Sequence, residues 1–323
     1  MLHEVRRVDA PFEWSGTTPT GLAAEVHRVL ERAEAYDGAA ALDEAALLAL
    51  RHRGLTGSTM LVTGDPVAGF AWLRGDDLAV VVDPVARAAG RGHALVSAAM
   101  THGVPEGTTA WSHGNHPGAA ALAETFGFER VRDLWVMRRS LGDLPPLPNA
   151  STGPGRGFVV RTFRPGHDED AFLAVNAEAF AHHPEQGRMT RADLDERMAE
   201  PWFDPAGFFV AEAVPVGEAG SATGRAGAPA PLVGFHWTKV HHGRHPVGEV
   251  YVVGVSPRAQ GSGLGRLLTL TGLHHLAAQG LLEVLLYVES DNAPAVAVYS
   301  RLGFTHAAAD THVQYRRVSA ARP

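Results

Sequence analysis

The stretch EVYVVGVSPRAQGSGLGRLLT, residues 249–269, decides the fold of this chain. Glu249 heads a near-continuous apolar run of the kind that forms a central strand covered on both faces of a sheet. A turn containing Pro257 follows, and glycines at 261, 263 and 265 lead into a segment with helical apolar spacing. We therefore predict a buried strand joined to a helix by a glycine-rich turn, the unit of an α/β fold.

The glycines of this turn suit an anion-binding loop. The first turn of a helix has free N–H groups and the positive end of the helix dipole, and glycine lets a phosphate approach the backbone closely. The sequence GSGLGR lacks the Lys-Ser/Thr of a P-loop, and its G-x-G-x-G spacing differs from that of dinucleotide-binding folds. From the pattern alone, a pyrophosphate loop and a glycine-rich turn without a ligand both remain open.

The two halves of the chain repeat one another. Pro84 and Gly90 recur 173 residues later as Pro257 and Gly263, and NHPGAAALAETFGF recurs as DNAPAVAVYSRLGF. Ordered matches of this kind indicate a tandem duplication and not a solenoid, which needs at least three repeats. We predict domains at 1–140 and 157–323 with a Pro- and Gly-rich linker at 141–156, and a long hairpin loop at 215–231.

Composition excludes several classes of function. A net charge of −7 over 323 residues argues against a nucleic-acid partner, because no excess of basic residues would neutralise phosphates. The absence of cysteine excludes disulfides, thiolate zinc sites and a cysteine nucleophile. We found no signal-peptide pattern and no apolar run of membrane-spanning length, so we expect a soluble cytoplasmic protein. The histidines of HHGRH, residues 241–245, have no accompanying acidic ligand, and we read them as a solvated turn.

The glycine loop and its surroundings resemble the GNAT superfamily of acyl-CoA transferases. QGSGLGR matches the superfamily's Q/R-x-x-G-x-G/A pyrophosphate loop, and DNAPAVAVYSRLGF is similar to its later N-x-x-A…Y-x-x-x-G-F segment. The resemblance covers both halves of the chain. It implies an α/β fold with a mixed sheet in each of two tandem domains, whose two central parallel strands, here 249–255 and 282–288, splay apart to admit the pantetheine of acetyl-CoA.

Several further segments resemble the mycothiol synthase family, which are two-domain GNAT enzymes. These segments are AFAHHPEQG, PWFDPAG, GFHWTKVH, GEVYVVGVSP and LLYVESDN, all in the second half. The resemblance implies acetyl transfer from acetyl-CoA to the cysteinyl amine of a cysteinyl-glucosaminyl-inositol, a small thiol-sugar substrate. It also implies that only the second domain is catalytic.

The resemblance assigns two catalytic side chains. Glu249 is expected to act as the general base that takes the ammonium proton, directly or through water. Tyr287 is expected to act as the general acid for the departing CoA sulfur, and a backbone N–H near Val253 should meet the oxyanion. The residues alone leave two other readings open: Glu249 could be a strand-end carboxylate paired with a Lys or Arg, and Tyr287 a buried aromatic.

Binding residues are also carried over from the family. The second domain is expected to hold the cofactor through Val253, Gly254, Val255, Gln260, Gly261, Ser262, Gly263, Leu264, Gly265, Arg266, Asn292, Ala293, Pro294, Ala295, Val296 and Ala297. The acceptor is expected to contact Glu44, Glu185 and Lys239 besides the two catalytic residues, with Asp37 in place of Glu44 as the alternative. Solvated surface charge is the competing reading for these side chains, and a helix N-cap for Asn292.

The first domain keeps the loop but changes the catalytic positions. Its expected cofactor residues are Val80, Val81, Val82, Ala88, Ala89, Gly90, Arg91, Gly92 and His93. Ala110 stands at the position of Tyr287, and Asp76 or Asp77 lies near the position of Glu249. We therefore expect a domain that does not transfer acetyl groups, whether or not it binds acetyl-CoA.

Three functions compete at this point. The first is mycothiol synthase; the second is a tandem-GNAT N-acetyltransferase of another amine, such as an antibiotic, an amino acid or a protein N-terminus; the third is a non-catalytic acetyl-CoA-binding protein. HHPEQG and GFHWTKV favour the first, and the presence of both Glu249 and Tyr287 argues against the third. We expect a monomer that uses acetyl-CoA, needs no metal, and has neither a nucleic acid nor a membrane as partner.

Overall fold

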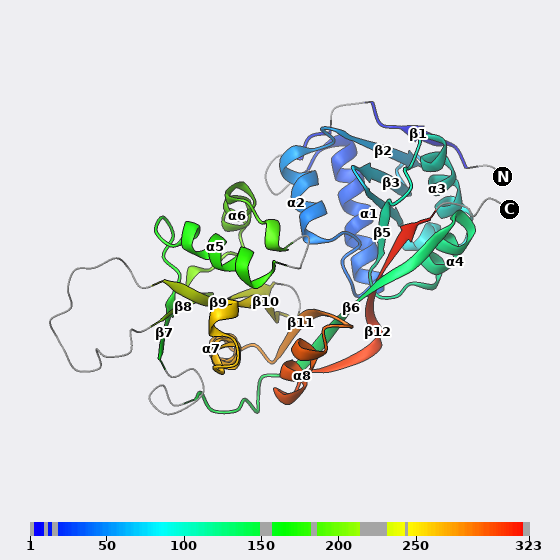
Figure 1. The fold of residues 1–323 in the computed structure, drawn as a ribbon. Coiled ribbons are helices and arrows are strands. Elements are labelled where there is room, and N and C mark those ends of the chain that lie inside the picture. Colours follow the sequence, from blue (N-terminus) through cyan, green and yellow to red (C-terminus); the bar gives the residue numbers. More distant parts are fainter. Residues whose placement is uncertain are drawn as a thin grey trace. The chain divides into compact units, whose positions relative to one another are not determined.

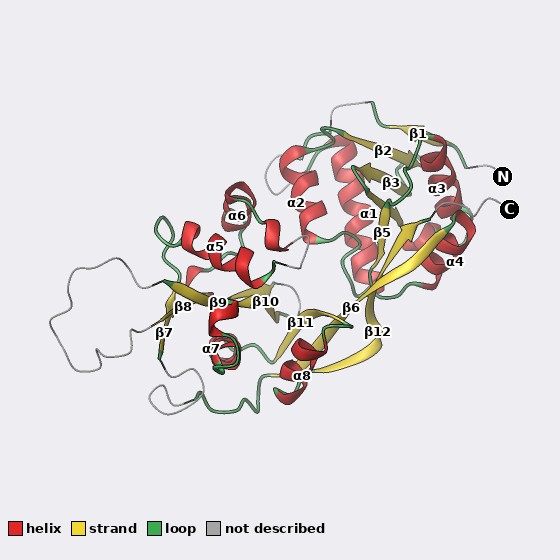
Figure 2. Cartoon of the chain, in the orientation of Figure 1, coloured by secondary structure: helices red, strands yellow, loops and turns green. Residues whose placement is uncertain are grey.

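The computed structural model describes residues 3–9, 12–14, 19–148, 157–181, 186–213, 231–242 and 245–318. The chain forms two compact units (Figure 1). The first comprises Met1–Val136, Glu289–Asn292 and Ala307–Pro323, and the second comprises Met137–Val288 and Ala293–His306. The helices and strands of the units are distinguished in Figure 2.

The first unit is a mixed sheet with helices on both faces. Its strands lie in the order β1-β2-β3-β4-β5-β12, and β4 and β5 are its parallel neighbours. Helices α1 and α2 pack on one face around Phe70 and Trp72, and α3 packs on the other around Leu61 and Ala71. The elements are β1 (Val5–Arg7), α1 (Gly21–Asp37), α2 (Glu44–Arg53), β2 (Ser58–Thr63), β3 (Gly69–Arg74), β4 (Asp77–Val82), α3 (Arg91–Thr101), β5 (Thr109–Ser112) and α4 (Pro117–Phe126).

The second unit repeats this plan. Its strands lie in the order β11-β10-β9-β8-β7, with α5 and α6 on one face and α7 on the other (Figure 1). Phe172 of α5 packs on Phe208 and Trp237, while Leu268 of α7 packs below Phe209. The elements are β7 (Phe158–Thr162), α5 (Glu169–Ala179), α6 (Arg191–Met198), β8 (Phe208–Ala213), β9 (Leu232–His241), β10 (Val247–Val255), α7 (Leu264–Ala278), β11 (Glu283–Glu289) and α8 (Ala293–Arg301).

The elements expected in the second half are confirmed. The helix expected after the glycine-rich turn corresponds to α7, and the strands expected at 249–255 and 282–288 correspond to β10 and β11. The expected hairpin loop at 215–231 lies almost wholly outside the described residues, although the flanking β8 and β9 do pair antiparallel. Most of the expected linker, 149–156, is also outside them.

Two long strands have residues in both units. β6 (Phe128–Ser140) begins in the first unit and ends in the second, and β12 (Thr305–Arg317) begins in the second and ends in the first. The end of β12 pairs antiparallel with β5, placing Val313 opposite Ser112 and Tyr315 opposite Ala110. Val313 and Tyr315 are buried in the core of the first unit. The domain boundaries expected from the sequence therefore remain a prediction. Because β6 and β12 each have residues in both units, a test of whether the domains fold independently must include these strands.

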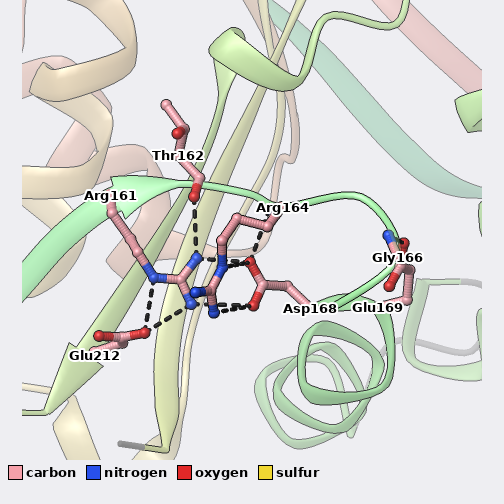
Figure 3. A network of polar contacts seen from close by, with 7 residues as sticks. All are labelled: Arg161, Thr162, Arg164, Gly166, Asp168, Glu169 and Glu212. Atoms are coloured by element: carbon pink, nitrogen blue, oxygen red, sulfur yellow. Dashed lines mark hydrogen bonds and ion pairs between the residues drawn. The ribbon is translucent and has the colours of Figure 1, made fainter. Parts of the chain in front are cut away.

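A buried ion-pair network fixes the outer edge of the second unit (Figure 3). Asp168, which is 3% exposed, accepts hydrogen bonds from the guanidinium groups of Arg161 and Arg164. Arg161 also donates to Glu212 of β8 at 2.7 Å. Burial alone would raise the pKa of Asp168, but the hydrogen bonds from Arg161 and Arg164 outweigh it and hold the pKa well below its usual range.

Candidate active site

The two central strands of the second unit separate along their length. β10 and β11 run parallel and pair through residues 248–250 and 284–286. β10 continues to Val255 and β11 to Glu289, so both strands extend beyond the paired stretch. This is the separation expected of strands 249–255 and 282–288.

A β-bulge lies in β10 at the same place. The register with β9 shifts between Val250 and Val252, which leaves Tyr251 as the extra residue. The alternation of side chains changes there: Val252 packs on the α5 side of the sheet, and Val253 on the α7 side. A bulge locally disrupts the regular ladder and bends the strand, here next to the strand separation. Residues 253–255, expected to bind the cofactor, follow directly.

The glycine loop connects β10 to α7. Gly261 and Gly263 have φ angles of 77° and 83°, in the left-handed region that glycine adopts without a steric penalty. Gly263 is the N-cap of α7 and has no side chain to satisfy the first-turn N–H groups. A Cβ at residue 265 would meet Val255 Cγ2 at 3.7 Å, an ordinary contact, so the protein's own packing does not require glycine there. These features suit close approach of a pyrophosphate.

One side chain of α5, Glu178, holds the turn before this loop. Ser256, which is buried, caps the short 3₁₀ turn Pro257–Ala259 and donates its hydroxyl to Glu178 Oε2 at 2.7 Å. Arg258 donates to the other oxygen of Glu178 at 3.0 Å. Gln260 lies across the end of β10, where its amide donates to the Val255 carbonyl at 3.4 Å. The turn is therefore fixed while residues 260–262 and 266 stay exposed.

Glu249 faces the α5 and α6 side of the sheet. Its neighbour Gly248 faces Leu276 of α7, so the alternation of a strand directs Glu249 to the opposite side. Lys239 of β9 is its cross-strand partner, and Leu285 of β11 its parallel partner. Two residues beyond Leu285, Tyr287 shares this face, just past the paired stretch. The structure therefore brings Lys239, Glu249 and Tyr287 onto one face of three adjacent strands.

The exposures of the two expected catalytic side chains differ. Glu249 is 5% exposed, whereas Tyr287 is 42% exposed. The alternative reading of Tyr287 as a buried aromatic is therefore wrong. A buried carboxylate beside a half-exposed phenol at a strand separation is an arrangement that could bind an amine and a thioester together.

The partner of Glu249 is a histidine that we expected in a solvated turn. His241 Nε2 lies 2.6 Å from Glu249 Oε2, at hydrogen-bond distance. The Lys239 ammonium instead lies over two rings, 4.3 Å from the centroid of Trp202 and 5.2 Å from that of Tyr251. The reading of His241 as a residue of a solvated turn is thus wrong, because His241 is the last residue of β9. The signal was present in HWTKVH, where His241 lies two residues after Lys239 and so on the same face.

The remaining expected acceptor residues are placed as follows. Glu185 lies outside the described residues. Glu44 is the first residue of α2 in the first unit, and Asp37 is the last residue of α1. Asp37 accepts a two-pronged pair from Arg87, at 2.6 and 2.7 Å, which gives it a structural partner within that unit.

The cofactor residues expected on α8 form its first turns. Residues 293–297 begin the helix, and Asn292 precedes it. Three of the five, 293, 294 and 297, are exposed, and α8 has no buried residue. A helix with this much accessible surface is compatible with contact to an extended ligand.

The first unit keeps the loop but lacks the bulge. β3 and β4 stay in register from residue 77 to residue 82, and β4 pairs with β5 at Asp77 and Thr109. Thr109 Oγ1 donates to Asp77 at 2.6 Å, so this carboxylate is engaged by a neighbouring side chain. The Gly90 turn has a φ of 84° and is the N-cap of α3, as Gly263 is of α7. A Cβ at residue 92 would meet Leu122 at 3.2 Å, so here the protein's own packing occupies the space beside the loop.

The described ranges contain neither a candidate metal site nor a candidate membrane-spanning helix. No group of three or more His, Asp or Glu side chains there could hold a metal ion. None of the helices in those ranges is long and apolar enough to cross a bilayer.

Comparison with known proteins agrees with this geometry. The model of the acetyltransferase (GNAT) family matches residues 176–304. The mycothiol acetyltransferase of Nocardioides sp. strain JS614 is 53% identical over 308 residues, covering 92% of this chain and 98% of the relative. That of Catenulispora acidiphila is 47% identical over 316 residues, covering 90% and 94%.

Solved structures show the same fold over the whole length. A tandem GNAT protein from the clavulanic acid biosynthesis pathway has a TM-score of 0.67 at 18% identity, covering 99% of both chains. A GCN5-related N-acetyltransferase from Sphaerobacter thermophilus has a TM-score of 0.61 at 24% identity, covering 95% of both. The predicted fold of two tandem GNAT domains is confirmed, and the chain belongs to the mycothiol acetyltransferase family of GNAT enzymes.

Proposed function

We propose that this protein is a mycothiol synthase. It transfers the acetyl group of acetyl-CoA to the cysteinyl amine of 1D-myo-inositol 2-(L-cysteinylamino)-2-deoxy-alpha-D-glucopyranoside and releases mycothiol and CoA. The observation that carries the proposal is the position of Glu249, buried in the last paired stretch before β10 and β11 separate and on the strand that ends in the glycine loop. The relatives named mycothiol acetyltransferase support the choice of acceptor.

The glycine loop binds the diphosphate of acetyl-CoA. First-turn N–H groups of α7 and the positive end of its dipole meet the negative charge, and Gly261, Gly263 and Gly265 leave the backbone accessible. The pantetheine then extends between β10 and β11 and brings the thioester to the bulge at Tyr251. A backbone N–H beside the bulge, near Val253, stabilises the oxyanion.

Glu249 removes the proton that blocks the nucleophile. An α-amino group has a pKa of about 8, so most of the acceptor is an unreactive ammonium at neutral pH. Glu249 takes one proton, the free amine forms a bond to the thioester carbon, and the C–S bond breaks as the tetrahedral intermediate collapses. Tyr287 supplies a proton to the leaving sulfur, and the second proton lost by the attacking nitrogen restores the phenol. Because the chain has no cysteine, a thioester intermediate on the enzyme is excluded. Direct attack of the amine on acetyl-CoA is the step that we propose.

The acceptor lies against the face that carries Lys239 and Glu249. Lys239 and the carboxylates expected at Glu44 and Glu185 would bind sugar and inositol hydroxyls. We place the enzyme in the cytoplasm as a monomer, with acetyl-CoA as its cosubstrate and no metal.

The test is an acceptor assay with mass spectrometry of the product. The purified protein should convert acetyl-CoA and the cysteinyl pseudodisaccharide to mycothiol and one equivalent of CoA. Turnover of simple amines without turnover of this acceptor would instead identify a different tandem-GNAT acetyltransferase. Acetyl-CoA binding without transfer to any amine would leave a binding protein.

A further inference from the structure

His241 connects a buried carboxylate to solvent. Glu249 has a side chain that is 6% exposed, and the His241 side chain, 43% exposed, contacts it through Nε2 at 2.6 Å. One edge of the imidazole therefore meets Glu249 Oε2, while nearly half of the side chain is accessible to water. The oxygen of Glu249 that His241 contacts, Oε2, is the one from which a proton would pass to the imidazole.

The partner of Glu249 is a histidine and not the nearest basic residue of the neighbouring strand. A carboxylate that needs only a neutralising charge could pair with the residue directly opposite it, and that residue is Lys239. Lys239 instead stacks over Trp202 and Tyr251. The side chain that contacts the Glu249 carboxylate is the imidazole of His241. An imidazole can accept a proton at one nitrogen and release one at the other near neutral pH.

We infer that His241 is a positioning residue for Glu249 and carries the abstracted proton from it to solvent; this rests on the proposed role of Glu249 as the base. Glu249 first takes a proton from the acceptor ammonium and becomes a carboxylic acid. It then gives that proton to Nε2 of neutral His241, which restores the carboxylate and forms an imidazolium. The imidazolium loses a proton from Nδ1 to water, and exchange with water then returns the ring to the tautomer with its proton on Nδ1, so that Nε2 can accept again. Each turnover moves one proton outward.

Other ionisable groups share this face and set the local charge. They are Lys239 on β9, Tyr251 on β10, Tyr287 on β11, and Arg197 of α6, whose Nε donates to the Tyr251 hydroxyl at 2.9 Å. Within this set, imidazole is the group that ordinarily changes charge between pH 5 and 8.

The first experiment compares His241→Ala with His242→Ala. His242 is the next residue and is exposed, which makes it the matched control. We expect His241→Ala to lower kcat about 10- to 100-fold, a part of what a general base contributes, with little change in KM for acetyl-CoA. The control should keep wild-type rates. A His241→Ala variant with wild-type kcat and pH profile would overturn the inference.

Chemical rescue distinguishes a proton relay through His241 from a role of His241 in folding alone. Added imidazole should restore the rate of His241→Ala in proportion to its free-base concentration. His241→Gln, which keeps a hydrogen-bond donor, should recover the orientation of Glu249 but not the response to pH. Absence of rescue, with the variant folded by circular dichroism, would contradict the relay.

A double-mutant cycle tests whether His241 acts through Glu249. In a Glu249→Gln background, His241→Ala should cause no further loss, because the proton that it would carry is never taken up. Additive losses would overturn the inference. If the wild type acetylates a simple amine and not the thiol-sugar, the same variants are assayed with that amine, so the two proposals fail separately. No turnover with any amine would remove both.

Discussion

Ala88 and Gly261 occupy the same position in the glycine loops of the two units, and both have left-handed backbone, with φ of 57° and 77°. Gly261 adopts this conformation without a steric penalty, whereas a residue with a Cβ is strained there by about 1 kcal/mol. A Cβ at residue 261 would meet no atom within 4 Å, so strain is the expected effect of adding one. Ala88 therefore introduces backbone strain in the first unit that Gly261 does not introduce in the second.

Exchanging these residues should change stability in opposite directions. We expect Ala88→Gly to raise the free energy of unfolding of the first unit, and Gly261→Ala to lower that of the second, by ~1 kcal/mol each. Calorimetry would follow each unit as a shift of a few degrees in its transition. Equal effects of the same sign would show that the loops are not conformationally equivalent.

Replacing the proposed base should make the rate depend on the acceptor's own ionisation. Glu249→Gln is expected to lower kcat/KM about 10²- to 10⁴-fold at pH 7. The loss should shrink above pH 9, because the amine, with a pKa of about 8, is then neutral without help. Initial rates between pH 6 and 10 measure this. A loss of equal size at every pH would contradict the role of Glu249.

Two tyrosines of the second unit can be compared as proton donors. Tyr287→Phe is expected to lower kcat about 10- to 100-fold while leaving acetyl-CoA binding intact. Tyr299 on α8 is the matched comparison. The residue is half-buried, and desolvation of its hydroxyl raises its pKa to about 12, so its phenol stays protonated at every pH of the assay. Tyr299→Phe should have the smaller effect on kcat. The reverse ranking would move the role of the acid to Tyr299.

The Asp168 network should stabilise the second unit above acidic pH. The folded pKa of Asp168 is depressed, so its contribution is present above the ordinary Asp pKa near 4 and is lost as pH falls through the folded value. Hydrogen bonds to charged groups contribute about 1.5 to 3 kcal/mol, and the arginine partners remain accessible to water, so Asp168→Asn is expected to cost about 2 kcal/mol at pH 7. Denaturant unfolding at pH 7 and pH 3 tests this. Asp170→Asn, at an exposed site on the same helix, is the control.

The local elements of this protein could be predicted from its sequence, because each has a pattern of its own. Glycines 261 and 263 mark the start of α7, and the apolar runs mark β10 and β11. The contact between His241 and Glu249 could not be predicted because it depends on the register of β9 against β10. Interpreting HHGRH as a turn placed His241 outside β9 and so hid this register.

The destination of the final strand could not be predicted for a different reason. The two halves have the same order of elements, so each half offers a similar place for a closing strand. Sequence pattern shows that β12 is a strand, but it does not show that Val313 and Tyr315 belong to the core of the first unit. That choice is made by tertiary packing over some 200 residues of sequence separation, as between Ser112 and Val313.

Removing the end of β12 should therefore unfold the first unit. A variant that ends at residue 306 loses Val313, which is 0% exposed, and Tyr315, which is 8% exposed. Burying side chains of this size contributes about 2 kcal/mol each, and β5 would also lose its partner strand. We expect loss of the calorimetric transition of the first unit, while a variant that ends at residue 318 keeps it. If residues 1–140 alone gave a cooperative transition equal to that of the full chain, the first unit would not need this strand.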